Sequence, residues 1–105
     1  MSTNYTIILT TYSRKVTGSR ITAALLAAKL AACIQVFPIR SAYFWQGKIA
    51  RDREFLMLIK ARTKRFNQVK ETILEHHDYK TPEIVSLRID RGFAGYLRWM
   101  GKVTR

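Results

Sequence analysis

The chain has 105 residues, and 48% of them are hydrophobic, which predicts one domain (residues 1–105) with its own apolar core. The single cysteine, Cys33, excludes an internal disulfide, and no apolar run resembles a signal peptide or approaches the roughly 20 residues of a membrane span, so we expect a cytoplasmic protein. Nineteen Lys and Arg against seven Asp and Glu give a net charge of +12, but no block of like charges forms a basic arm, which favours a solvated basic surface over an anion-binding surface.

The first part of the chain predicts a strand followed by a helix. Tyr5–Tyr12 is rich in Ile, Thr and Tyr, which favour strands. Residues 13–19 are polar and contain a glycine, so we expect them to form a connection. The helix ends near Lys29 or Leu30, and its apolar residues recur at helical spacing: Ile21, Ala24, Leu25 and Ala28.

A long hairpin is predicted next. Cys33–Phe37 is an apolar strand interrupted by Pro38, and because proline cannot donate a ladder hydrogen bond, this strand is expected at a sheet edge or kinked there. The extended pattern resumes at Ser41–Trp45 and turns at Gln46-Gly47. It returns through Phe55–Lys60, after a charged segment that we expect to be the exposed part of the arm.

The last part predicts a helix, a strand and a short final helix. Thr63 is expected to cap the second helix, which ends at the His76-His77-Asp78 segment. Ile84–Ile89 returns to a strand, and Arg91–Met100 forms the final helix. The buried stripe of the second helix is expected to contain Phe66, Val69, Ile73 and Leu74.

The order β-α-β-β-α-β, with a further C-terminal helix, is typical of an α+β, ferredoxin-like domain with an extended hairpin. Such a domain packs two helices on one face of an antiparallel sheet, and no helix remains here to cover the other face. The hairpin also displays Tyr43, Phe44 and Trp45. Because an isolated two-stranded arm is marginally stable in water, we expect another chain to supply the cover.

Several segments are distinctive and recur at compatible spacing over nearly the whole chain. They are KLAAC at 29–33, SAYFWQGK at 41–48 (similar to S-x-Y-x-W-x-G-K), Glu54 with Lys60, HHDYKTPEI at 76–84 (close to H-P-Y-x-x-P-E-I) and YLRW at 96–99 (Y-L-x-W). Together these segments resemble the CutA family. The resemblance implies a ferredoxin-like subunit in a tight homotrimer whose extended hairpins pair sheet edges between subunits.

The resemblance also implies a role in divalent-cation tolerance, with His76 and His77 as ligands of Cu(II) or another divalent cation. Neighbouring helical side chains point about 100° apart, so such a site needs a further ligand from Asp78, Cys33 or another subunit. Some members carry a copper-binding cysteine where this chain has Thr10-Thr11. Capping or packing at the helix end is the alternative role of the histidines, and we assign no resident cofactor.

A ligand or interface group is predicted from residue types. Its members combine aromatic walls with a cation and an anion: Tyr43, Trp45, Lys60, Tyr79 and Glu83. We favour contacts that hold the trimer together, and a pocket that binds a small anion, as in a PII-like trimeric sensor, is the alternative. Trp99 is expected to anchor an interface or the core.

No catalytic motif is present, so we do not expect an enzyme. An RNA-binding module is the alternative from another class, because RNA-recognition domains share this element order and the chain is basic. Arg91–Ala94 matches the start of an RNA-binding motif, but this segment follows the last strand, so we do not expect a nucleic-acid partner.

Overall fold

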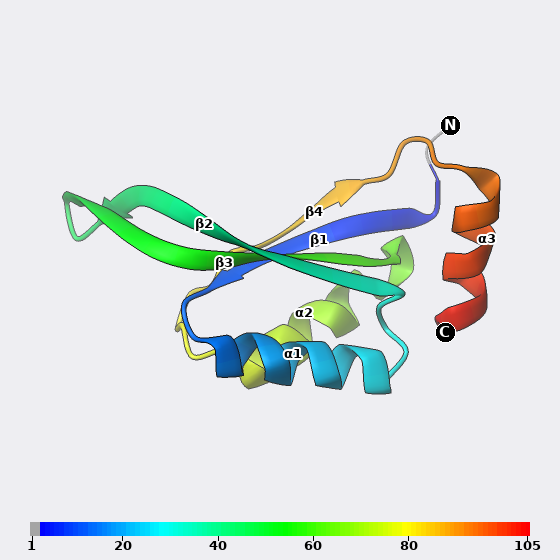
Figure 1. The fold of residues 1–105 in the computed structure, drawn as a ribbon, viewed down its shortest axis with the longest axis horizontal. Helices are drawn as coiled ribbons and strands as arrows, with labels where there is room; N and C mark the ends of the chain where they lie inside the picture. The colour runs from blue at the N-terminus through cyan, green and yellow to red at the C-terminus, as the bar shows by residue number, and fades with distance from the viewer. Residues whose placement is uncertain (1–2) are drawn as a thin grey trace.

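The computed structural model describes residues 3–105 and confirms the predicted α+β, ferredoxin-like fold (Figure 1). Its antiparallel sheet has the strand order β2-β3-β1-β4. In chain order the elements are β1 (Tyr5–Tyr12), α1 (Lys15–Ala27), β2 (Cys33–Trp45), β3 (Lys48–Arg62), a short 3-10 turn (Thr63–Arg65), α2 (Phe66–His76), β4 (Ile84–Arg88) and α3 (Ala94–Val103).

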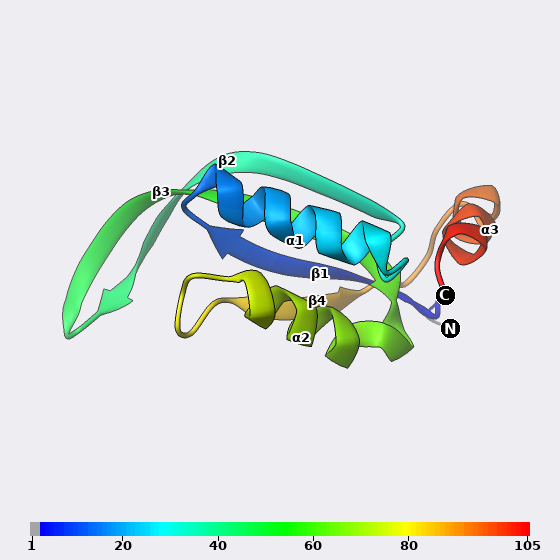
Figure 2. The same ribbon diagram turned by 90° about the horizontal axis from the view of Figure 1, so that it is seen from below.

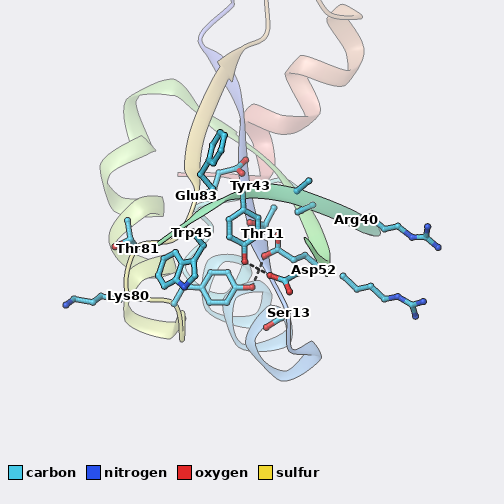
Figure 3. Close-up of a pocket in the computed structure, with 15 residues that line it drawn as sticks. Thr11, Ser13, Arg40, Tyr43, Trp45, Asp52, Lys80, Thr81 and Glu83 are labelled. Carbon is cyan, nitrogen blue, oxygen red and sulfur yellow. Dashed lines mark hydrogen bonds between the residues drawn. The ribbon is translucent and has the colours of Figure 1, made fainter. Parts of the chain in front are cut away.

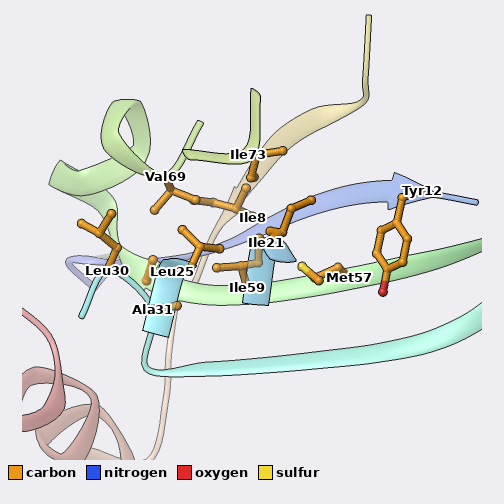
Figure 4. Close-up of a cluster of buried hydrophobic side chains, with 11 residues drawn as sticks. Ile8, Tyr12, Ile21, Leu25, Leu30, Ala31, Met57, Ile59, Val69 and Ile73 are labelled. Carbon is orange, nitrogen blue, oxygen red and sulfur yellow. The ribbon is translucent and has the colours of Figure 1, made fainter. Parts of the chain in front are cut away.

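Both long helices cover the same face of the sheet, and α3 lies apart from them at one end (Figures 1 and 2). The core fills the space between the two layers, where alternate side chains of β1 and β3 meet the apolar stripes of α1 and α2 (Figure 4). Burying each large apolar side chain contributes about 1.5–3 kcal/mol. The most deeply buried members are Ile8, Ile21, Leu25, Met57, Ile59, Val69 and Ile73.

Helix α1 begins earlier than the polar sequence of residues 13–19 predicts. It starts at Lys15 and contains Gly18 in its first turns. A Cβ at residue 18 would overlap the ring of Tyr12, which is buried. The glycine therefore permits close helix–strand packing and does not mark a connection.

Strand β2 runs without interruption through Pro38 and pairs with β3 from Cys33 opposite Lys60 to Trp45 opposite Lys48. It lies at the edge of the sheet, as predicted, where a missing backbone donor is tolerated. Gln46 and Gly47 both have positive φ, at 51° and 75°, which is the backbone of a tight two-residue turn. The resulting arm projects beyond the helices (Figure 1).

Within residues 3–105 no element covers the other face of the sheet, as the element order predicts, apart from α3 at its end near Lys60 and Arg62 (Figure 1). Strand alternation and the observed register place apolar side chains of all four strands there. Val85 and Leu87 retain 48% and 60% of their accessible surface. We call this surface the open face: Ile7, Leu9, Phe37, Leu56, Leu58, Val85 and Leu87.

Two expectations for the second helix are wrong. Thr63 does not cap it, because the chain enters α2 through the 3-10 turn, and the Thr63 hydroxyl is buried without a hydrogen-bond partner among the described residues. Leu74 is 43% exposed and lies outside the buried stripe. Ile73 occupies the core-facing position, and the next helical residue is rotated about 100° away from it.

Candidate functional site

His77 lies just after α2 and holds the loop that follows. Its Nε2 lies 2.8 Å from the carbonyl oxygen of Thr11, and its Nδ1 accepts a hydrogen bond of 3.0 Å from the backbone N–H of Tyr79. The carbonyl can only accept and the backbone N–H can only donate, so the contacts select the neutral ring with its proton on Nε2. The side chain is fully buried. His77 therefore offers no free nitrogen to a metal in this arrangement.

His76 is the last residue of α2 and is half-buried. The structure does not bring it together with His77 as a chelating pair. Among residues 3–105 there is no group of three or more His, Cys, Asp or Glu side chains arranged to hold a metal ion. The donors that this part of a single chain offers do not fit a copper site.

A pocket of about 1040 Å³ lies where the arm meets the loop after His77 (Figure 3). It brings together four predicted members of the ligand or interface group: Tyr43, Trp45, Tyr79 and Glu83. The remaining lining residues are Thr11, Ser13, Arg40, Ser41, Ala42, Phe44, Asp52, Arg53, Glu54, Lys80 and Thr81.

Two tyrosine hydroxyls in this pocket donate to carboxylates of β3. Tyr79 donates to Glu54 Oε2 at 2.7 Å, and Tyr43 donates to Asp52 across the arm (Figure 3). The bond to Asp52 raises the pKa of Tyr43 to about 12. Burial, followed by the bond to Glu54, raises the pKa of Tyr79 despite an opposing bond to Ser13. Both phenols thus remain protonated donors at neutral pH.

Asp78 connects the same loop to the start of α1. The Thr17 hydroxyl donates to its carboxylate at 3.1 Å, and Arg14 lies 3.6 Å from it. Burial favours a higher pKa of Asp78, but the bonds from Thr17 and a backbone N–H, together with the charge of Arg14, outweigh it and lower the pKa. With His77, this carboxylate fixes the loop that carries Tyr79 into the pocket.

The remaining member of the group, Lys60, and the predicted anchor Trp99 lie elsewhere. Lys60 contacts Tyr96 of α3, with a hydrogen bond of 3.3 Å to the hydroxyl and its ammonium 5.3 Å from the ring centre. Trp99 packs against the same ring at 5.4 Å between centroids. The predicted cation is thus absent from the pocket, and Lys60 and Trp99 form a separate cluster with α3.

Sequence reasoning did not assign Asp52 and Glu54 to this site. The register shows why they belong there, since Ser41 faces Asp52 and Ile39 faces Glu54 across the arm. For Asp52 the alternation of strand side chains is the only sequence signal, and it requires the register to be known. Glu54 also stands in one of the segments that carry the family resemblance.

Comparisons with known proteins point to one family. The family model described as "CutA1 divalent ion tolerance protein" matches residues 6–103. A divalent-cation tolerance protein CutA of Archaeoglobus fulgidus is 42% identical over 83 residues, which cover 79% of this chain and 81% of that protein. The chloroplastic protein CutA 1 of Oryza sativa is 35% identical over 100 residues, covering 94% of this chain but only 56% of the longer plant protein.

A solved structure described as the periplasmic divalent cation tolerance protein CutA from Archaeoglobus fulgidus superposes with a TM-score of 0.93 at 36% identity, covering 96% of this chain and 99% of that one. None of the helices within residues 3–105 has the length and apolar character that crossing a bilayer requires.

Proposed function

Because the chain belongs to the CutA1 family of divalent ion tolerance proteins, we propose that it acts in divalent-cation tolerance as a homotrimer. The open face carries this proposal. Its apolar side chains span all four strands, and contiguous exposed apolar surface of this kind marks an association site. We further propose a non-catalytic, cytoplasmic role, to which the single free thiol of Cys33 is suited.

The position of the pocket supports a functional interface between subunits. Glu54 and Asp52 continue along β3 on the same side as Leu56 of the open face. A neighbouring subunit that covers the open face would also close the pocket over Tyr43 and Tyr79. The Tyr79–Glu54 and Tyr43–Asp52 bonds then fix the shape of the surface that the neighbour meets.

A matched pair of variants tests this proposal. Leu87→Asp places a charge on the open face, whereas Leu26→Asp places the same charge on the outer side of α1, where the side chain is 47% exposed. We expect light scattering to show a trimer for the wild type and Leu26→Asp, and loss of the trimer for Leu87→Asp. Cells that depend on this chain should lose tolerance of raised Cu(II) only with Leu87→Asp. A Leu87→Asp protein that stays trimeric would refute the assigned interface.

A divalent cation bound by the assembly needs donors from more than one subunit, because residues 3–105 of a single chain supply no suitable cluster. His76 is the histidine free to contribute, since His77 is occupied on both nitrogens. A Cu(II) titration of the wild type and His76→Ala tests this role. Equal affinity in both proteins removes His76 from the ligand set.

The charges lining the pocket do not decide the alternative of a small anion bound there. Three carboxylates, Asp52, Glu54 and Glu83, are matched by three cations, Arg40, Arg53 and Lys80, and the cation expected for that site, Lys60, lies at the α3 cluster. The RNA-binding alternative gains no support either. Residues 91–93 lie in the loop before α3 and not on a strand that presents aromatic side chains.

A further inference from the structure

The side of the arm that faces away from the Tyr43–Asp52 pair carries an arginine cluster. The register places Arg40 directly opposite Arg53, and Arg51 lies two residues further along β3. Side chains alternate along a strand, so all three share one side of the arm, which we call the arginine face. Figure 3 shows Arg40 pointing away from Tyr43 and Asp52.

The three arginines are exposed and lack partners among residues 3–105. None of them makes a hydrogen bond or ion pair with another described residue. Asp52, the carboxylate nearest in sequence, points to the other side and accepts the hydrogen bond from Tyr43. Like charges directly opposite each other across a strand pair are destabilising. The Arg40–Arg53 pair therefore carries a repulsion that an anion would relieve.

The surface at this cluster is hollowed. A shallow depression of about 480 Å³ is lined by the three arginines with Ser41, Ala42 and Asp52. Guanidinium groups present a rigid fork of donors that matches phosphate oxygens in bidentate geometry. Arg51 and Arg53 are two strand residues apart, about 7 Å along the backbone, within reach of neighbouring phosphates on one short chain.

We propose that the arginine face binds an oligophosphate, a ligand with two or three linked phosphate groups. The site is compact, because the three guanidinium groups arise from adjoining positions on two paired strands. Phe44 and Ile49 follow on the same side toward the tip and are 82% and 61% exposed. An aromatic ring beside the cluster suits a nucleoside attached to the phosphates, whereas a free oligophosphate uses the arginines alone.

This inference goes beyond the proposed function and concerns another surface. The arginine face lies on the helix-facing side of the sheet, opposite the open face. A subunit that covers the open face therefore contacts the side of the arm opposite the three guanidinium groups, although Arg40 and Arg53 also border the pocket of Tyr43 and Tyr79. The binding site and the assembly can be tested separately.

Calorimetric titration of the assembled protein with inorganic tripolyphosphate at low salt tests the proposal. Arg40→Gln/Arg53→Gln should weaken binding at least about tenfold, since charge-assisted hydrogen bonds of this kind are each worth that factor or more. Arg20→Gln/Arg98→Gln is the matched control, because it removes the same charge from exposed positions on α1 and α3 and should bind like the wild type. Light scattering on each variant reports assembly separately.

A parallel titration with adenosine triphosphate distinguishes the two sources of the phosphates. Tighter binding than tripolyphosphate, with the difference abolished by Phe44→Ala, identifies a nucleotide, and equal affinities identify a free oligophosphate. Absence of binding, or an equal loss in the two double variants, overturns the proposal. A short single-stranded RNA that binds more tightly through Arg40 and Arg53 also overturns it, in favour of a nucleic-acid site.

Discussion

Two buried threonines on β1 differ in one hydrogen bond. The Thr6 hydroxyl donates to the carbonyl oxygen of Leu87 at 2.9 Å. The Thr10 hydroxyl is fully buried and has no partner among the described residues. Burying an unpaired hydroxyl costs free energy, whereas a paired one contributes to stability.

The same isosteric substitution should therefore have opposite effects at these two positions. Thr10→Val is expected to raise the free energy of unfolding by up to about 1 kcal/mol, and Thr6→Val to lower it by about 1 kcal/mol. Urea denaturation of both variants measures the difference. A loss of stability in Thr10→Val as large as in Thr6→Val would show that its hydroxyl has a partner.

The lowered pKa of Asp78 makes a prediction about acid stability. A carboxyl group with a lowered pKa in the folded state stabilises the protein fully above its ordinary pKa, near 3.9, and this contribution disappears as the pH falls through the lower folded-state value. Asp78→Asn should thus reduce stability at neutral pH and flatten its pH dependence below about pH 4. The effect is at most about 1 kcal/mol, because the ion pair with Arg14 is partly exposed.

Thermal unfolding between neutral and acidic pH checks this prediction. Asp90→Asn is the control, because Asp90 lies 3.8 Å from Arg91 on a highly exposed surface and should show no such dependence. Identical acid profiles for Asp78→Asn and the wild type would contradict the role assigned to Asp78.

At the residue scale, sequence reasoning identified the aromatic members of the pocket but not their partners. Tyr43, Glu54 and Tyr79 stand in recognisable segments, whereas Asp52 does not, and the pairing register of the arm is what brings the carboxylates to the tyrosines. The two histidines were predictable as the end of α2. One of the contacts that occupy the ring nitrogens of His77 is made to Thr11 on the distant strand β1. No local sequence pattern predicts this contact.

The packing of α1 on β1 depends on a missing side chain. A Cβ at residue 18 would overlap the Tyr12 ring, so Gly18→Ala forces the helix or the ring to move. We expect this substitution to lower the free energy of unfolding by about 1–3 kcal/mol, as overpacking does, despite the higher helix propensity of alanine.

Ser19→Ala is the neighbouring control, at an exposed position of the same helix. It should leave stability unchanged or raise it by a few tenths of a kcal/mol, roughly the gain in helix propensity. Chemical denaturation compares the two variants. If Gly18→Ala proves as stable as the wild type, the contact with Tyr12 does not limit the approach of α1.

At the element scale, composition, residue spacing and turn residues predicted the four strands and the three α-helices that residues 3–105 form. The predictions are wrong at positions where tertiary contacts determine the local structure. Gly18 was interpreted as a connection because its contact with Tyr12 is invisible in the sequence. Thr63 precedes α2 as a capping residue would, but the chain forms a 3-10 turn there first.

At the scale of the whole molecule, two surfaces of the single chain remain exposed: the open face and the arm. The open face presents apolar residues from every strand, and the arm projects beyond the body with Trp45 61% exposed near its tip. An isolated arm of two strands is marginally stable in water, so both features are explained by a neighbour that covers the sheet and supports the arm. The sequence predicted this need from the element order and from the aromatic residues of the hairpin.

Sedimentation equilibrium of the wild-type protein at micromolar concentration tests the central claim most directly. Assembly through the open face as a homotrimer predicts a mass three times the 12.2 kDa of the chain, unchanged on moderate dilution. A folded species that sediments as a stable monomer of 12.2 kDa would contradict the account.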